Sequence, residues 1–441
     1  MARESPARIA RMARLSIAAL LLVIGVTAPA AAQVTAFVGG RVIDGTGRVI
    51  EGATVVVRDG VIAEVGPGAS VRVPDGATRV DTTGKTLMPG IVNAHGHLSP
   101  VNGFRTSPEL YRRDNLVRQL KTYATYGVTT VFSLGDDQAD AFALRAEQAT
   151  AAPDRARVYV AGPIVYTDTA EAARVETDKV IALKPDLIKV RVDDNLGSTK
   201  KMPEAAWRAT LERAKAANLT LAAHIFYLAD ATLLAEAGNT FIAHSVRDLP
   251  VDQRFLTAMK ASSACYSPTL MREVSTFAYD ETPAWTTDPF FRRAYGADIV
   301  AEMSDPGRQA KFKASNAYAQ GQKYKAGLEV AKANLKRVHD AGIRIAFGTD
   351  SGPAGRFQGY FEHLELEMMV QAGLTPMQAI VSATGTAADC WHKAGELGTI
   401  ARGARADFLV LDRNPLDDIR NTRAIASIVI GGRTFTPPVV R

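Results

Sequence analysis

Short apolar runs alternate with alanine- and charge-rich stretches over the middle of the chain, from about residue 88 to residue 393. The stretches 204–217 and 229–237 have helical composition. The strand-like runs lie at 127–132, 158–161, 186–190, 219–223 and 240–243. Alternating strands and helices over this length predict an α/β fold, a (β/α)8 TIM-like barrel. A doubly wound open sheet is the alternative, but no Gly-x-Gly-x-x-Gly follows the first strand.

Both ends of the chain have a different pattern. Residues 34–80 form short strand-like runs broken by glycine, and Asp59-Gly60 between two valine-rich runs is a hairpin-turn signal. Strand-like runs return at 407–411 and 425–430. We therefore expect a small composite β-sandwich domain made of residues 33–87 and 394–441. The barrel, residues 88–393, would be inserted into this domain.

One interval breaks the alternation. Residues 271–340 are far more chain than a single barrel helix requires, and they include several aromatic side chains. Long insertions after barrel strands usually shape access to the substrate. A packed helical pair without a chemical role is the alternative.

Residues 1–32 have the pattern of an export signal. Four arginines precede the apolar run 15–26, and the small residues Ala30-Ala31-Ala32 offer a cleavage site. The apolar run is short for a membrane span, which needs about 20 residues. We expect a cleaved signal peptide, a periplasmic or secreted protein, and no stable membrane span after removal of the leader. An uncleaved N-terminal anchor is the alternative.

Composition narrows the classes of function that remain possible. The 441 residues are 47% hydrophobic and 22% charged, as in ordinary globular proteins. The net charge of +6 resides partly in the leader, and no basic cluster with interleaved aromatics suggests a nucleic acid partner. An exported compartment would permit a disulfide between the two cysteines, Cys265 and Cys390. Because they lie in different kinds of segment, we expect two free, buried thiols.

Two histidines end the apolar stretch that begins at Leu87. Side chains at positions i and i+2 of a strand point to the same side, so His95 and His97 project together. Two convergent neutral imidazoles begin a divalent metal site. By themselves they are equally compatible with a ligand-free pair of strand-end histidines.

Other candidate ligands also fall at the ends of predicted strands: His224, His244 and Asp350. The carboxyl ends of parallel barrel strands form one face, so residues distant in sequence converge there. Lys189 lies within an apolar strand, where an unpaired ammonium is costly to bury. It is either a lysine that reaches solvent at the rim or an amine that takes up carbon dioxide to form a carbamate.

The chain resembles the amidohydrolase superfamily over essentially all of its length after the leader. The resemblance rests on residues 89–98, on Gly348-Thr349-Asp350-Ser351-Gly352 and on 396–412. It is nearest to the binuclear-metal members with a carboxylated lysine, which include imidazolonepropionase-like enzymes and prolidase-like Xaa-amino acid dipeptidases.

The resemblance implies two divalent metal ions, zinc being the expected metal. His95, His97 and Asp350 would hold one ion. His224 and His244 would hold the other, and carboxylated Lys189 would bridge the two. Two positions depart from the dipeptidase pattern, Phe226 after the strand-five histidine and Arg191 after the bridging lysine.

The expected reaction is hydrolysis of an amide bond in a small peptide or N-acyl amino acid. A water between two divalent ions is deprotonated near neutral pH, and Asp350 could pass its proton to the leaving nitrogen. Tyr227 could donate to the oxyanion, or it could fill the barrel top. A lactonase or phosphotriesterase, and a barrel scaffold without catalytic activity, are the alternatives.

Three arginines could bind a carboxylate of the small-molecule substrate: Arg191, Arg247 and Arg356. Guanidinium groups bind carboxylates in a bidentate geometry. The alternative is that these arginines pair with neighbouring acids such as Asp193 or Asp248. The sequence leaves the oligomeric state open, a homo-oligomer included.

Overall fold

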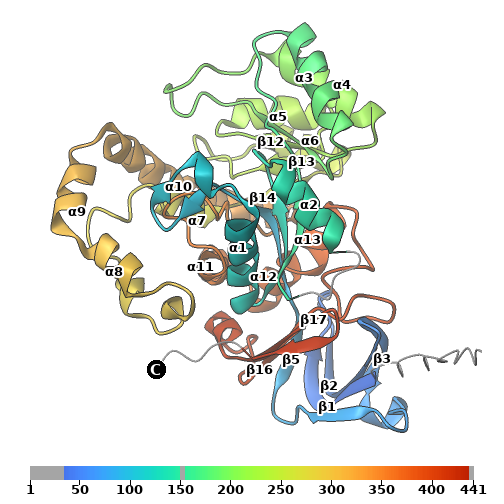
Figure 1. Cartoon of the computed structure of the whole chain (residues 1–441). Helices are drawn as coiled ribbons and strands as arrows, with labels where there is room; N and C mark the ends of the chain where they lie inside the picture. Colours follow the sequence, from blue (N-terminus) through green and yellow to red (C-terminus); the bar gives the residue numbers. More distant parts are fainter. Residues whose placement is uncertain (1–33, 149–153, 437–441) are drawn as a thin grey trace, which may run out of the picture. The chain divides into compact units, whose positions relative to one another are not determined.

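The computed structural model describes residues 34–148 and 154–436 (Figure 1). The signal peptide predicted over residues 1–32 lies outside the described residues. Within these two ranges, no helix is both long and apolar enough to cross a lipid bilayer.

One sheet combines strands from both ends of the described chain (Figure 1). Its strands are β1 (Val34–Ile43), β2 (Val49–Arg58), β3 (Val61–Pro67), β4 (Thr78–Asp81), β5 (Thr86–Pro89), β16 (Phe408–Leu411), β17 (Ile425–Ile430) and β18 (Arg433–Phe435). Antiparallel pairing of β5 with β16 places Leu87 opposite Val410 and joins the two chain ends. Asp59 and Gly60 both have a positive φ, which confirms the predicted hairpin between β2 and β3. The boundaries of the composite domain stay a prediction.

Parallel strands with a helix after most of them occupy the middle of the chain. One sheet contains β6 (Ile91–Gly96), β9 (Val128–Ser133) and β10 (Arg157–Val160). The other contains β11 (Ile188–Arg191), β12 (Leu221–His224), β13 (Phe241–Ala243), β14 (Cys265–Ser267) and β15 (Arg344–Ile345). Regular ladders do not join these two sheets into one ring in the described part of the chain. Single parallel bridges link their edges, Val165 with Val190 and Gly96 with Ser351.

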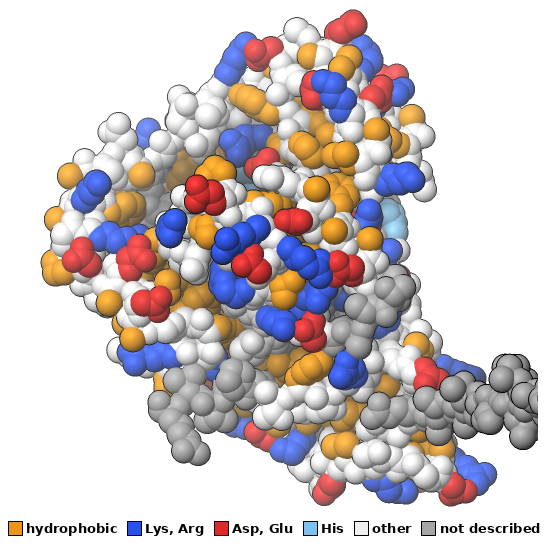
Figure 2. All heavy atoms as spheres, viewed as in Figure 1, with side chains coloured by type: hydrophobic (Ala, Val, Ile, Leu, Met, Phe, Trp, Pro, Cys, Tyr) orange, Lys and Arg blue, Asp and Glu red, His pale blue; other side chains and the backbone are white. Residues whose placement is uncertain are grey.

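The helices before the insertion are α1 (Arg113–Thr125), α2 (Ala139–Glu147), α3 (Ala170–Ala182), α4 (Glu204–Ala216), α5 (Leu228–Glu236) and α6 (Gln253–Ala261). Those after it are α11 (Tyr360–Gln371), α12 (Pro376–Ser382) and α13 (Gly385–Cys390). The predicted helices 204–217 and 229–237 are confirmed as α4 and α5. A two-stranded ribbon, β7 (Val101–Asn102) and β8 (Arg105–Thr106), follows β6. On the face shown in Figure 2, Lys and Arg side chains over α1 and α2 are interspersed with Asp and Glu, and Arg113 is paired with Glu147.

The segment predicted as an insertion forms a helical arch (Figure 1). It contains α7 (Leu270–Val274), α8 (Ala297–Ser304), α9 (Pro306–Lys313) and the long α10 (Asn316–Asp340). The inner face of α10 buries Tyr324, Leu328, Ala331 and Leu335 at helical spacing. The Tyr324 hydroxyl donates to Asn195 Oδ1 at 2.5 Å. The insertion is therefore attached to the loop after β11.

Cys265 and Cys390 form a disulfide, so the expectation of two free thiols is wrong. Cys265 begins β14 and Cys390 ends α13, and their Cα atoms are 6.1 Å apart. The two segments are 125 positions apart in sequence. They meet because α13 returns to the parallel strands, a tertiary contact that segment type alone does not predict.

Candidate metal centre

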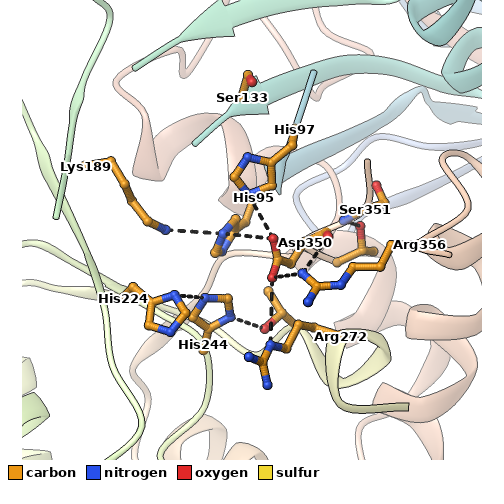
Figure 3. Close-up of polar contacts among 12 residues, drawn as sticks. His95, His97, Ser133, Lys189, His224, His244, Arg272, Asp350, Ser351 and Arg356 are labelled. Atoms are coloured by element: carbon orange, nitrogen blue, oxygen red, sulfur yellow. Dashed lines mark hydrogen bonds and ion pairs between the residues drawn. The ribbon is translucent and has the colours of Figure 1, made fainter. Parts of the chain in front are cut away.

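All six residues predicted as metal ligands line one cavity of about 340 Å3 (Figure 3). They are His95, His97, Lys189, His224, His244 and Asp350. His95 and Lys189 lie in strands, His224 ends a strand, and the other three directly follow strands or strand-like segments. The carboxyl ends of the parallel strands therefore bring them together.

The side chains of this group contact one another closely. His97 Nε2 lies 2.8 Å from Asp350 Oδ1, and His95 Nε2 lies 3.8 Å from the same oxygen. His224 Nδ1 lies 2.8 Å from His244 Nε2. On the other side of His95, its Nε2 lies 3.3 Å from Lys189 Nζ.

Burial controls the ionisation of these groups. It lowers the pKa values of His95 and His244 well below the usual range, and it lowers the pKa of His224 to about 4. It also lowers the pKa of Lys189 to about 7. Burial opposes ionisation of Asp350, but the Arg356 guanidinium and His97 hold the pKa of this carboxyl well below its usual value. The site therefore contains neutral imidazoles at His95, His224 and His244 and an ionised carboxylate at Asp350 at neutral pH.

This donor set fits a divalent metal. One ligand nitrogen or oxygen from each of His95, His244 and Asp350 lies within 4.8 Å of the others. His95 Nδ1 is buried and has no hydrogen-bond partner in the structure. Neutral imidazole and carboxylate are ligand types that Zn²⁺ prefers in proteins.

A buried glutamate that the sequence analysis missed is hydrogen-bonded to residues next to two of the candidate ligands. Glu362 Oε1 accepts hydrogen bonds from Asn93 Nδ2 (2.6 Å), Thr349 Oγ1 (2.8 Å) and Ser351 Oγ (2.6 Å). Asn93 Oδ1 in turn accepts from the backbone N–H of His95 at 2.9 Å. The signal for this network was the set of polar residues next to His95 and Asp350 in otherwise apolar segments. Glu362 fixes the backbone on both sides of the candidate metal centre.

The structure brings two of the three predicted substrate arginines to the cavity. Arg191 and Arg356 line it, and Arg356 Nη1 is 2.5 Å from Asp350 Oδ2. Arg247 is not at the cavity; it is 2% exposed, forms an ion pair with Glu273 and donates to the Ile225 carbonyl. His244 has a φ of 75°, so the chain turns after β13 and Arg247 does not continue the strand direction.

Tyr227, the predicted oxyanion donor, does not line the cavity either. Its hydroxyl donates to Asp194 Oδ1 at 2.8 Å. Tyr227 is the N-cap of α5, so the chain has already left the direction of β12. The structure therefore gives no support to the oxyanion role.

Arg272 is a cavity residue that the sequence analysis missed. It lies in α7, just after β14, and its guanidinium is directed at Asp350 (Figure 3). Its position at the start of the predicted insertion, residues 271–340, was the signal that could have identified it. Asp136, in the loop after β9, also lines the cavity and has a positive φ of 60°.

Enzymes built on parallel strands carry their active sites at the carboxyl ends of these strands, where this cluster of buried ionisable groups lies. Residues 86–435 match the model of the amidohydrolase family, and the chain belongs to this family. Membership makes it a hydrolase of carbon–nitrogen bonds and confirms the resemblance.

Individual relatives resemble the chain over most of its length. Ochratoxinase of Aspergillus niger is 25% identical, covering 92% of this chain and 88% of that protein. Imidazolonepropionase of Porphyromonas gingivalis is 26% identical, covering 84% of this chain and 86% of that protein. A crystal structure of a Xaa-Pro dipeptidase with methionine bound in its active site has a TM-score of 0.73 at 18% identity, covering 92% of this chain and 100% of that one.

Proposed function

We propose that the chain is a binuclear metal-dependent amidohydrolase that cleaves the amide bond of a small peptide or N-acyl amino acid. The observation that carries this proposal is the convergence of four histidines, a lysine and an aspartate at one cavity. His95, His97 and Asp350 would hold one divalent ion, and His224 and His244 would hold the second. Zinc suits these ligands.

We propose that Lys189 carries a carbamate that bridges the two ions. In the described part of the chain, Lys189 is 2% exposed and forms no ion pair with a carboxylate; its hydrogen-bond contact is His95 Nε2. A buried cation beside histidines that bind a metal ion would repel that ion. Addition of carbon dioxide to the neutral amine, with release of one proton, would replace this cation with an anionic ligand that has two oxygens.

Divalent ions bound here would lower the pKa of a water and polarise the substrate carbonyl. The protein's own groups would complete the reaction. Asp350 is ionised and buried, so it can accept the proton of the attacking water and deliver it to the leaving nitrogen. Glu362 holds the backbone on either side of Asp350 through Thr349 and Ser351.

The substrate proposed here carries a carboxylate. Arg191 and Arg356 line the cavity, and the Arg191 guanidinium has no hydrogen bond or ion pair in the described structure. A guanidinium without an acceptor is a ready partner for a substrate carboxylate. The match to the amidohydrolase family over residues 86–435 supports C–N bond cleavage as the reaction.

A combined metal and substrate screen tests the proposal. Purified protein should contain about two divalent ions per chain, and chelation should abolish its activity until zinc is restored. It should hydrolyse dipeptides or N-acyl amino acids faster than lactones or phosphotriesters. A metal content near zero, or selective hydrolysis of lactones or phosphotriesters, would refute it.

Two further proposals concern architecture and location. We propose that the two parallel sheets form one (β/α)8 barrel. The bridges Val165–Val190 and Gly96–Ser351 support this arrangement. We also propose that the chain is exported, as its leader predicts. The Cys265–Cys390 disulfide supports export, because disulfides persist mainly in oxidising compartments.

A further inference from the structure

Three arginine side chains lie among acidic side chains on one side of the candidate metal centre. Arg247 Nη1 and Arg272 Nη1 both form ion pairs with the Glu273 carboxylate, the second at 3.0 Å. Arg356 pairs with Asp350, and Arg272 Nε lies 4.0 Å from Asp350 Oδ2. Arg247 Nη2 also lies 4.0 Å from Asp193 Oδ2. Three guanidinium groups and three carboxylates therefore meet in this cluster.

Only part of this cluster faces the cavity. Arg247 is enclosed, whereas Arg272 and Arg356 line the cavity wall. The Arg272 guanidinium stacks on the Tyr324 ring, 4.2 Å from its centroid. Glu273 and Tyr324 thus hold the guanidinium in one orientation, with its Nε toward Asp350 (Figure 3).

Arg272 has an unused donor in this position. Its Nε is buried and has no hydrogen-bond partner in the structure. A buried charged donor without an acceptor costs free energy, and an anionic acceptor within the cavity would remove that cost. A carboxylate fits best, because the guanidinium fork matches its two oxygens.

We propose that Arg272 is a specificity-determining residue that binds the carboxylate of the leaving amino acid. This inference rests on the proposed amidase function. In an N-acyl amino acid, the carboxylate is attached to the carbon that bears the scissile nitrogen. Asp350, which would protonate that nitrogen, lies 4.0 Å from Arg272 Nε, so both groups of the substrate are within reach.

The inference also gives the insertion a role. Arg272 belongs to α7 and Tyr324 to α10, and both helices lie in the segment that exceeds a single barrel helix. Tyr324 is attached through its hydroxyl to Asn195, another residue of the cavity wall. The insertion therefore supplies the group that selects the substrate, whereas the strand ends supply the reactive centre.

Matched substrates and variants test this role. A panel of N-acetyl amino acids is compared with the corresponding C-terminal amides in the wild type, Arg272→Met and Arg272→Lys. Methionine keeps an unbranched stem over Tyr324 without charge, and lysine keeps the charge without the fork. Arg293→Met is the control, because Arg293 also belongs to the insertion and stacks on Phe290 at 4.7 Å but does not line this cavity.

We expect the wild type to prefer the free acid by at least about tenfold in kcat/KM, as for a charged hydrogen bond. Arg272→Met should lose this preference through KM, Arg272→Lys should retain part of it, and Arg293→Met should match the wild type. Calorimetry should show the same order of the variants when the affinity for the free amino acid product is compared with the affinity for its amide. Arg272→Lys keeps the test decisive if the methionine variant fails to fold.

The inference and the proposed function fail in different ways. Equal cleavage of acid and amide by the wild type, or an equal loss for both forms in Arg272→Met, overturns the role of Arg272 and leaves amide hydrolysis standing. If no amide is cleaved, the proposed function fails. Calorimetry then decides the inference: equal affinity for acid and amide refutes it, and an Arg272-dependent preference for the acid supports it.

Discussion

The disulfide should contribute a large share of the protein's stability. Cys265 and Cys390 are 125 positions apart, so their bond closes a long loop in the unfolded chain. Loop-closure entropy for this length corresponds to about 5 kcal/mol at room temperature. The loop contains the whole helical insertion, β15 and helices α11 to α13. Reduction should therefore loosen the unfolded ensemble across this entire region.

A second effect must be separated from the cross-link. Both cysteines are buried, so replacement by alanine also removes packed atoms. Loss of a buried methylene-sized group costs about 1 kcal/mol. Either single variant removes the disulfide completely, because the bond needs both cysteines. Packing contacts, in contrast, are lost only at the position that is replaced.

Urea unfolding distinguishes the two contributions. The free energy of unfolding is compared for the oxidised wild type, the reduced wild type, Cys265→Ala, Cys390→Ala and the double variant, all at one metal concentration. We expect the free energy of unfolding of the reduced wild type to be lower by most of the loop-closure contribution of about 5 kcal/mol. The single variants should lose slightly more, and the double variant only about 1 kcal/mol beyond them.

Two results would refute this reasoning. Equal unfolding free energies of oxidised and fully reduced wild type would show that the bond does not constrain the unfolded chain. A double variant that loses the sum of the two single losses would show independent packing effects in place of one shared bond.

Three further predictions concern single side chains. Lys189→Ala should lose metal and lower activity by orders of magnitude, as measured by metal analysis and turnover; two retained metals with near-normal turnover would make Lys189 a rim lysine. Asp350→Asn should keep the fold by circular dichroism but lose proton transfer and weaken one metal, and wild-type rates at every pH would reject the shuttle. Burial lowers the pKa of His363 to about 3. As the pH falls below about 6.5, this imidazole therefore becomes protonated in the unfolded chain but stays neutral in the native state. Relative to His363→Gln, the wild type should therefore lose about 2 kcal/mol of unfolding free energy between pH 7 and pH 5, and identical pH profiles would contradict this.

Residues placed by strand periodicity could be predicted from the sequence. His95 and His97 share one side because strand residues alternate, and Arg191 reaches the cavity because it continues the strand two positions after Lys189. The same reasoning fails where the backbone turns. The positive φ of His244 and the start of α5 at Tyr227 redirect the residues that follow.

Other contacts depend on tertiary structure, and the pattern along one element does not name the partner. Glu362 lies on α11, and only the packing of this helix brings it to Asn93 and Ser351. The disulfide likewise needs α13 to return to β14. Periodicity describes only neighbours along one element. It therefore predicts which residues at a strand end point to the same side, but not which side chains other elements place beside them.

The two parts of the site differ in what fixes their geometry. The backbone at His95 and Asp350 is held by main-chain hydrogen bonds and by Glu362, whose partners are neutral side chains. Arg272 is instead held by Glu273 and the Tyr324 ring, and Glu273 is shared with Arg247. A change of one charge in that cluster alters the field at every other member, whereas the strand ends keep their positions. If Arg272 binds the substrate carboxylate as we propose, substrate selection could change through the insertion while the backbone of the metal centre keeps its position, as expected when a rigid scaffold presents variable loops.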